Sequence, residues 1–364
     1  MEGHARTEEE VLDAIERRRR RPRRKLLDDR ITLAHGAGGK STHALIESLF
    51  LEQLRNPLLE PLADSAVLRA GGASGPRLAF TTDSFVVKPL FFPGGDIGEL
   101  AVNGTVNDLA MAGATPLCLS AGFIVEEGLP VEDLARIAAS MGAAAQAAGV
   151  DVAAGDTKVV ERGKADGVYV NTSGVGIVEH ELELGPTAIR PGDRVLLSGT
   201  LADHGMAIMI ARGELELEVE LESDTAPLHG IVAALLAATD QVRALRDPTR
   251  GGLATVLNEL ALASETAVVL DERALPVGAE VRGACEILGI DPLYVANEGK
   301  LAAVVAPEAA DAALAALLAH PLGRDAAIVG EVRDDPPGMV LLETAFGGSR
   351  VVDVLTGDPL PRIC

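Results

Sequence analysis

The chain has 364 residues with a formal net charge of −22, and 48% of its residues are apolar although only 2% are aromatic. This length is enough for two domains with their own cores, which must be built mainly from Ala, Val, Leu and Ile. No apolar run reaches the roughly 18 residues that a membrane span requires, and the negative charge would repel phosphates. We therefore expect no membrane partner, and nucleic acid is disfavoured as a partner.

The first residues differ in charge from the rest of the chain. Residues 17–25 carry eight basic side chains, and the run is preceded by Glu8, Glu9 and Glu10 and is not followed by an apolar segment. This pattern excludes a secretory or twin-arginine signal. We predict that residues 1–28 form a disordered basic extension, with a tether to nucleic acid or membrane as the alternative.

A glycine-rich loop follows the first predicted strand, at residues 30–34, and leads into a helix with one apolar face. A Walker A motif requires a glycine six residues before its lysine, and the chain has Ala34 there. The loop still offers bare backbone N–H groups and one lysine, which can close over phosphates, although a flexible turn is the alternative. The residues concerned are Gly36, Gly38, Gly39 and Lys40.

Aspartates recur at the ends of apolar segments. Asp64 precedes a short apolar segment, and Asp83 lies at the end of a predicted strand at 78–84, where α/β proteins commonly bind ligands. Asp247 lies in a sharp turn, where it could cap the next helix or face a site. Carboxylate oxygens suit Mg²⁺, especially when the ion also bridges phosphates.

A predicted helix at 96–113 is nearly all apolar and should therefore be buried. Asn103 and Asn107 lie four residues apart and share one face, with Asp108 beside them. Burying such groups costs on the order of several kcal/mol unless they are satisfied. A cation or a polar ligand would satisfy them, and a structural polar network is the alternative.

The remaining segments alternate between strand and helix, which is typical of α/β and α+β proteins. Residues 150–160 look like a strand broken by a polar turn, and 214–222 suits a solvated strand or loop. A domain boundary is expected near 180–190. Further strands are predicted at 116–126, 167–178, 194–199, 301–305, 326–332, 339–343 and 350–355, and further helices at 131–148, 228–242, 253–263 and 307–319.

The chain ends in a cysteine. The three cysteines lack CxxC or metal-ligand spacing, which argues for a reducing compartment, and we expect a cytoplasmic protein. Cys118 and Cys285 lie in apolar runs and are interpreted as buried hydrophobic residues. Two prolines precede Cys364, which favours an extended, unpaired arm that does not fold back. Such an arm suits a carrier thiol that visits more than one site, and a frayed terminus is the alternative.

The order of the motifs resembles that of a known family. Between residues 31 and 364 the chain contains HGAGGK, DSAVL, TTDS, NGTVNDLAMAG, AAGDTK, DHG, DPTRGGL, NEG and PRIC. Together they are similar to the HypE family, the carbamoyl dehydratases of NiFe-hydrogenase maturation. That family belongs to an ATP-binding superfamily with aminoimidazole ribotide synthetase (PurM), selenophosphate synthetase and thiamine-monophosphate kinase. The terminal cysteine favours the HypE family, because selenophosphate synthetase would carry its reactive residue near the N-terminal glycine-rich loop.

The resemblance implies a PurM-like two-domain fold, in which an N-terminal α/β domain is followed by an α+β domain. The N-terminal domain would form a β-barrel shared across a homodimer. We place the N-terminal domain at 29–185, the C-terminal domain at 186–350 and a mobile tail at 351–364.

ATP and Mg²⁺ are the cofactors that the resemblance implies. The matching motif positions assign the nucleotide to Gly36, Gly38, Gly39, Lys40, Asp64, Thr82, Asn107, Gly155, Asp156 and Thr157. They assign Mg²⁺ to Asp64, Asp83, Asp108 and Asp247.

The resemblance also implies a reaction and its partners. HypF would place a carbamoyl group on Cys364, ATP-driven dehydration would convert the S-carboxamide into an S-thiocyanate, and the cyanide would pass to iron on the HypC–HypD complex. Phosphorylation makes the amide oxygen a good leaving group, and a base must take protons from the nitrogen. Glu298 is the candidate base, and Lys158 would orient the carbamoyl group or neutralise charge. Either could instead be a surface salt-bridge residue.

Two other functions fit the same residues. Another ATP-dependent kinase or synthetase of this fold would leave Cys364 incidental, and a non-catalytic maturation scaffold would only dock partners by its tail. Phosphate release per turnover separates an enzyme from a scaffold.

Overall fold

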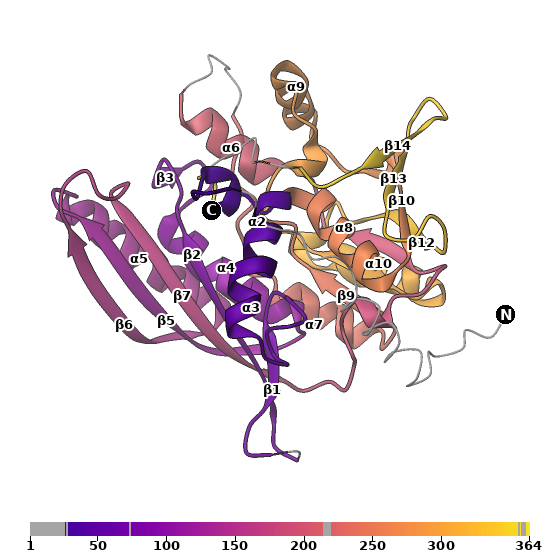
Figure 1. Ribbon diagram of the computed structural model, residues 1–364, viewed down its shortest axis with the longest axis horizontal. Helices are drawn as coiled ribbons and strands as arrows, with labels where there is room; N and C mark the ends of the chain where they lie inside the picture. The colour runs from indigo at the N-terminus through magenta and orange to yellow at the C-terminus, as the bar shows by residue number, and fades with distance from the viewer. Residues whose placement is uncertain (1–25, 27, 73, 214–219, 356, 358–361) are drawn as a thin grey trace.

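The computed structural model describes residues 26, 28–72, 74–213, 220–355, 357 and 362–364 (Figure 1). Most of the predicted basic extension, the stretch 214–219 and Pro359–Pro361 of the tail lie outside the described residues. Among the helices that are described, none combines the length and the apolarity that crossing a lipid bilayer requires.

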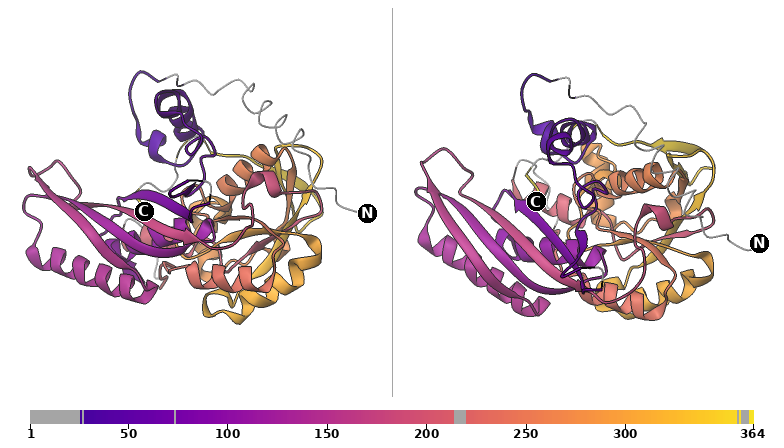
Figure 2. Two further views of the ribbon diagram at one scale, coloured as in Figure 1. Left: turned by 90° about the horizontal axis from the view of Figure 1, so that it is seen from below. Right: turned by 60° about the horizontal axis from the view of Figure 1, so that its bottom comes forward.

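The N-terminal half is built on a five-stranded sheet with the strand order β1-β2-β7-β5-β6. β5 and β6 run parallel, and the other neighbours run antiparallel. The helices α4 (Ile97–Met111) and α5 (Val131–Ala148) cover one face of this sheet, as Figure 2 shows. The strands are β1 (Ala66–Arg69), β2 (Arg77–Phe85), β5 (Thr115–Glu126), β6 (Asp151–Val160) and β7 (Val168–Val178), with a small ribbon of β3 (Phe91–Phe92) and β4 (Gly95–Asp96).

The C-terminal half is built on a seven-stranded sheet with the order β14-β13-β10-β12-β8-β11-β9. β10 and β13 run parallel, and the other neighbouring strands run antiparallel. The strands are β8 (Arg194–Leu197), β9 (Val242–Arg246), β10 (Ala267–Asp271), β11 (Ala302–Val305), β12 (Ala327–Arg333), β13 (Val340–Glu343) and β14 (Ser349–Val352). The helices are α6 (Asp203–Ala211), α7 (His229–Ala238), α8 (Gly252–Ser264), α9 (Ala279–Leu288) and α10 (Ala310–Ala319).

Helix α4 joins the two halves. The Asp96 side chain caps its first turn by accepting the N–H groups of Gly98 and Glu99. The helix packs against β2 and β7 on one side and against α7 and β9 of the C-terminal half on another. Because it is covered from several directions, α4 is apolar around most of its circumference, and its few polar side chains face neighbours from both halves.

The glycine-rich segment leads into short helices that lie outside both sheets (Figure 1). α2 (Lys40–Leu45) is followed by a π-helical stretch at Ile46–Phe50 and by α3 (Leu51–Leu54). The helix predicted after the loop is therefore confirmed. The strand predicted at 30–34 is wrong: a 3₁₀ helix spans Leu33–Gly36 and is closed by hydrogen bonds between Thr32 and His35.

One other predicted element is wrong, and one predicted helix is confirmed but too long. The segment 150–160 is one continuous strand, because β6 pairs with β5 along its whole length and absorbs the irregularity as a shift of register. The helix predicted at 228–242 ends at Ala238, and the chain then enters β9. Strand β10 and helix α9 were not predicted. The other predicted strands and helices are confirmed with boundaries shifted by a few residues.

The described end of the tail is paired, so the prediction of an unpaired arm is wrong there. Ile363 forms an antiparallel bridge with Val87, and its side chain is 3% exposed. Strand β14 ends at Val352, inside the range assigned to the tail. The chain end therefore returns to the N-terminal half.

Candidate active site

Three aspartates from separate segments meet at the junction of the two halves. Asp64 lies just before β1, Asp108 lies on α4, and Asp247 follows β9. One carboxylate oxygen of each lies within 4.8 Å of those of the others. The Thr81 hydroxyl donates to Asp108 Oδ2 at 2.6 Å, and Arg246 Nε lies 2.8 Å from Asp64 Oδ1. Neighbouring side chains thus hold the cluster in place.

This donor set fits Mg²⁺. The three aspartates supply hard oxygen ligands without histidine or cysteine, and Mg²⁺ prefers such ligands. The fourth predicted ligand, Asp83 on β2, lies beside the cluster, where its Oδ1 is 4.0 Å from Arg250 Nη2. Metal binding by all four stays a prediction that this geometry favours.

Burial dominates the electrostatics of the cluster. It raises the pKa of Asp64 to about 6, although Arg246 opposes the shift. Burial and then the charge of Asp64 raise the pKa of Asp247 to about 8. Burial, followed by the charges of Asp247 and Asp83, raises the pKa of Asp108 well above its usual range. Without a cation the folded protein therefore retains protons here, and a bound divalent cation would favour their release.

We expect the metal-free protein to lose stability as the pH rises from about 5 to 8. A carboxyl group with a raised folded-state pKa stabilises the fold below its unfolded-state pKa of about 4, and this contribution is lost as the pH rises through the folded-state pKa. For Asp64 and Asp247 the folded-state pKa values are about 6 and about 8. The loss should be on the order of a few kcal/mol. Urea unfolding at pH 5 and pH 8, with a chelator present, measures this loss in the free energy of unfolding. If Asp247→Asn leaves the pH dependence unchanged, the raised pKa of Asp247 is not its cause.

Glu298 is buried close to the cluster and is 3% exposed. Its N–H donates to Asp224 Oδ1 at 2.9 Å. Burial, followed by the charges of Asp247 and Asp83, raises the pKa of Glu298 well above its usual range. Its Oε1 has no hydrogen-bond partner among the described residues. A buried oxygen without a partner is costly, so a ligand here would be stabilised by contact with Glu298.

Asn107 ties α4 to the loop that carries Glu298. Its Nδ2 donates to the carbonyl oxygens of Ala226 at 3.1 Å and Glu298 at 3.0 Å, and its Oδ1 accepts the N–H of Leu228 at 2.7 Å. These contacts account for the buried amide that the sequence singled out. Nucleotide binding by Asn107 stays a prediction.

The glycine-rich loop lies against the turn that follows Asp247. Gly38 has a φ of +75°, and a Cβ there would lie 2.9 Å from the carbonyl oxygen of Arg250, so this approach requires glycine. The Lys40 N–H donates to the Leu355 carbonyl at 2.8 Å, and its Nζ pairs with Asp353 at 2.5 Å. In this structure Lys40 contacts the root of the tail. Phosphate binding by Gly36, Gly38, Gly39 and Lys40 stays a prediction.

Five predicted site residues are directed away from the cluster of Asp64, Asp108 and Asp247 in their own chain, or lie far from it along the sheet. Thr82 points to the opposite face of the sheet from Asp83, because side chains alternate along a strand. The register places Gly155 in line with Asp83 across β7 and β5, which corresponds to roughly 14 Å. Lys158 Nζ pairs with Asp156 at 2.7 Å, and both side chains are exposed. The five residues are Thr82, Gly155, Asp156, Thr157 and Lys158.

The end of the chain docks beside these groups. The Val86 N–H donates to a terminal oxygen of Cys364 at 2.9 Å, and the Lys88 N–H donates to the Arg362 carbonyl at 3.2 Å. The charge of Cys364 is the largest cause of the raised pKa of Arg250, and the charges of nearby carboxylates add to it. Arg250 is thus close both to the terminal cysteine and to the carboxylate cluster.

Sequence reasoning did not assign roles to Arg250, His204 or Arg212, which all contact or face the docked tail. Arg250 lies in the same turn as Asp247, and His204 lies in the DHG motif. A cationic side chain three residues after a candidate metal ligand is a signal that could have identified Arg250. No local pattern marks Arg212.

Both halves of the chain match known domain families. Residues 62–178 match the N-terminal domain of AIR synthase related protein, and residues 190–342 match its C-terminal domain. Carbamoyl dehydratase HypE of Rhizobium leguminosarum bv. viciae is 55% identical over 336 residues, which cover 92% of this chain and 95% of that protein.

Solved structures of HypE proteins match the fold of this chain. The crystal structure of hydrogenase maturation protein HypE in complex with ATP has a TM-score of 0.77 at 47% identity and covers 92% of this chain and 100% of that chain. A HypE chain from the HypE–HypF complex has a TM-score of 0.81 at 48% identity, covering 86% and 100%. With both AIR synthase related domains in order and such identity over nearly its whole length, the chain belongs to the HypE family of carbamoyl dehydratases.

Proposed function

We propose that this chain uses ATP to dehydrate a carbamoyl group carried on its own Cys364, converting the S-carboxamide into the S-thiocyanate that supplies cyanide to NiFe-hydrogenase iron. The observation that carries the proposal is the docked chain end, which lies close to Arg250 and to the carboxylate cluster. Membership of the HypE family supports the reaction, and the relative solved with ATP supports the nucleotide.

The proposed chemistry balances in two steps. The carbamoyl oxygen attacks the γ-phosphorus of ATP, ADP leaves, and the oxygen becomes part of a phosphate leaving group. The carbon–oxygen bond then breaks, phosphate departs, and the nitrogen loses its two protons as the nitrile forms. Glu298 would accept one of these protons when it is ionised, and the other would leave on the departing phosphate. Burial and the charges of Asp247 and Asp83 raise the pKa of Glu298, and the charge of Arg250 opposes this rise.

Positive charge must accompany the transferring phosphoryl group. Arg250 supplies it from the turn that faces the docked tail. When bound, Mg²⁺ neutralises phosphate charge and polarises the transferring group. Its proposed ligands are Asp64, Asp108 and Asp247, with Asp83 beside them.

HypF as carbamoyl donor and the HypC–HypD complex as cyanide acceptor are the proposed partners. A relative 48% identical to this chain has been solved in a HypE–HypF complex. The thiol must reach partners outside and the phosphate inside, so the tail must alternate between an exposed and a docked pose. Three free cysteines support a reducing, cytoplasmic setting for these transfers.

We propose a homodimer in which the five-stranded sheets of two chains form a shared barrel. The face opposite α4 and α5 carries exposed apolar side chains such as Phe80 and Ile124. β6 is an edge strand that is exposed along nearly its whole length. A second copy pairing here would cover both features, which are unfavourable in water. In such a dimer Lys158 and its β6 neighbours would complete the site of the partner chain.

Mixed dimers test this sharing of sites. We expect Cys364→Ala and Lys158→Ala proteins each to be inactive alone. In a mixed dimer, one of the two sites combines an intact cysteine from one chain with an intact lysine from the other. Equal mixing should therefore restore about a quarter of the wild-type dehydration rate.

The exposed Lys164, in the loop after β6, provides the matched control, since Lys164→Ala should remain active. Native mass spectrometry verifies that mixed dimers have formed. Verified mixed dimers without recovered activity would mean that Lys158 does not serve the partner's cysteine.

Mass spectrometry of the C-terminal peptide tests the function itself. After incubation with HypF, ATP and carbamoyl phosphate, the peptide should appear first as the thiocarbamate and then as the thiocyanate, which is one water lighter. One ADP should form for each dehydration. A peptide that remains a thiocarbamate would indicate a scaffold, and ADP formation without modification of Cys364 would indicate another kinase or synthetase.

A further inference from the structure

Helix α6 and the residue that follows it also hold the docked chain end. His204, in the first turn of α6, is fully buried, and its Nε2 lies 2.5 Å from the Ile363 carbonyl oxygen. Arg212, just after α6, donates from Nη2 to the Arg362 carbonyl at 2.8 Å. Two successive carbonyl groups of the tail are therefore bound by side chains of one helix and its cap.

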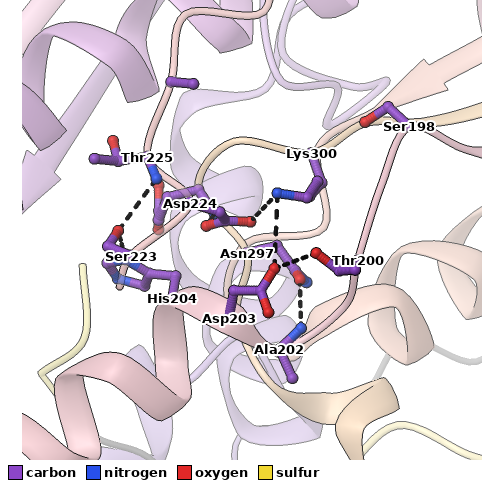
Figure 3. Close-up of polar contacts among 12 residues, drawn as sticks. Ser198, Thr200, Ala202, Asp203, His204, Ser223, Asp224, Thr225, Asn297 and Lys300 are labelled. Carbon is purple, nitrogen blue, oxygen red and sulfur yellow. Dashed lines mark hydrogen bonds and ion pairs between the residues drawn. The ribbon is translucent and has the colours of Figure 1, made fainter. Parts of the chain in front are cut away.

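The partners of His204 fit the tautomer in which Nε2 carries the hydrogen. A carbonyl oxygen can only accept, so Nε2 must be the donor toward Ile363. Nδ1 lies 2.8 Å from Ser223 Oγ, which also accepts the Thr225 N–H at 3.1 Å and keeps its own hydrogen available to donate to Nδ1. Burial lowers the pKa of His204, which favours this neutral tautomer. Figure 3 shows Ser223 between His204 and Thr225.

The segment that carries Ser223 also holds the loop of Glu298. The Ser223 N–H is itself fixed by the Pro93 carbonyl at 2.8 Å. The next residue, Asp224, accepts the Glu298 N–H at 2.9 Å. Asp224 also pairs with Lys300 Nζ at 3.0 Å, as Figure 3 shows. The histidine that contacts the tail and the loop of the candidate base are therefore positioned by adjacent residues.

We propose that His204 is the positioning residue for the carrier cysteine: it holds the tail in the docked pose by donating its Nε2 hydrogen to the Ile363 carbonyl, in a tautomer set by Ser223. This carbonyl precedes the cysteine and is the same whether the thiol is free, carbamoylated or cyanated. The inference rests on the proposed function for the role of Cys364, whereas the docking itself requires neither ATP nor a carbamoyl donor.

Alkylation of the full-length chain by iodoacetamide, without ATP, tests the docking. The rate at Cys364, read from its peptide by mass spectrometry, reports the undocked fraction. Cys118, half-buried on β5, and Cys285, 2% exposed on α9, report the fold in the same sample. His204→Leu should raise the Cys364 rate by about 10- to 100-fold, as expected for loss of a buried hydrogen bond, and leave the other two rates unchanged.

Conservative and control variants separate the hydrogen bond from a packing role. His204→Gln keeps an N–H donor and should stay within about threefold of the wild-type rate at Cys364. His229→Leu removes a half-buried histidine from the start of α7 and should leave that rate unchanged. A His204→Gln protein as reactive as His204→Leu would overturn the proposal.

If His204→Leu exposes Cys285, that variant has lost its fold, and Ser223→Ala then tests whether His204 positions the tail. With Cys285 still protected, Ser223→Ala should raise the Cys364 rate by about 3- to 10-fold, because the donor tautomer of His204 is no longer enforced. An unchanged rate in this variant, or in a folded His204→Leu protein, overturns the proposal. If the variants behave as expected while the peptide is never dehydrated, the docking stands and the proposed function fails.

Discussion

Cys364→Ala is expected to abolish thiocyanate and cyanide formation while leaving the fold and ATP binding intact. The sulfur would carry the substrate, so no other group can replace it. The backbone of the chain end, the Ile363 side chain and the Arg362–Asp166 ion pair make docking contacts that this substitution retains. Mass spectrometry of the C-terminal peptide measures the modification, and calorimetry measures ATP binding.

Cys118→Ala is the matched control, because it removes a half-buried thiol from β5 and should leave the product yield unchanged. If the Cys364→Ala protein released cyanide at the wild-type rate, this result would contradict the carrier-thiol proposal. Loss of ATP binding in the same variant would instead indicate that the docked tail forms part of the nucleotide site.

Asp108→Asn is expected to weaken Mg·ATP binding by about 100- to 1,000-fold, because a charged ligand of a buried cation is removed. Dehydration should stop, and carbamoylation of Cys364 by HypF should continue. The metal-free protein should become more stable at pH 8, since burial and the charges of Asp247 and Asp83 raise the pKa of Asp108 and an amide avoids that cost. Calorimetry with Mg·ATP and urea unfolding without metal measure the two effects.

These opposite effects distinguish a metal ligand from a structural carboxylate. Asp193→Asn is the control: Asp193 is 2% exposed, burial raises its pKa to about 6, and it lies outside the cluster. Its substitution should leave Mg·ATP affinity unchanged. An Asp108→Asn protein with wild-type affinity would remove Asp108 from the proposed metal site.

Local patterns were sufficient for several elements. The helix predicted at 131–148 coincides with α5, and the apolar segment at 96–113 contains α4, because helical periodicity is a property of one continuous segment. The sequence also indicated that the polar residues within this apolar helix need polar partners, and Asp108 indeed joins the carboxylate cluster. The ordered motifs also indicated the family, which the comparisons confirm.

The same local reasoning failed where a partner strand decides the outcome. Residues 150–160 contain a polar turn-like sequence, yet pairing with β5 keeps β6 continuous. The motif on β6 was assigned to the site, but the register places it across the sheet from Asp83 in the same chain. Strand direction and register depend on the neighbouring strand, which the segment itself does not encode.

The sequence by itself showed a cysteine after two prolines at the last position. It also showed aspartates and glycines in the order of a recognisable family. Tertiary structure alone decided that Ile363 pairs with Val87 and meets His204, 159 positions away in the chain. An extended chain end exposes N–H and C=O groups without a fixed partner, so its conformation depends on which groups the folded body offers. Here those groups come from both halves, and they exist as a docking site only after α6 and the segment after β2 have packed together.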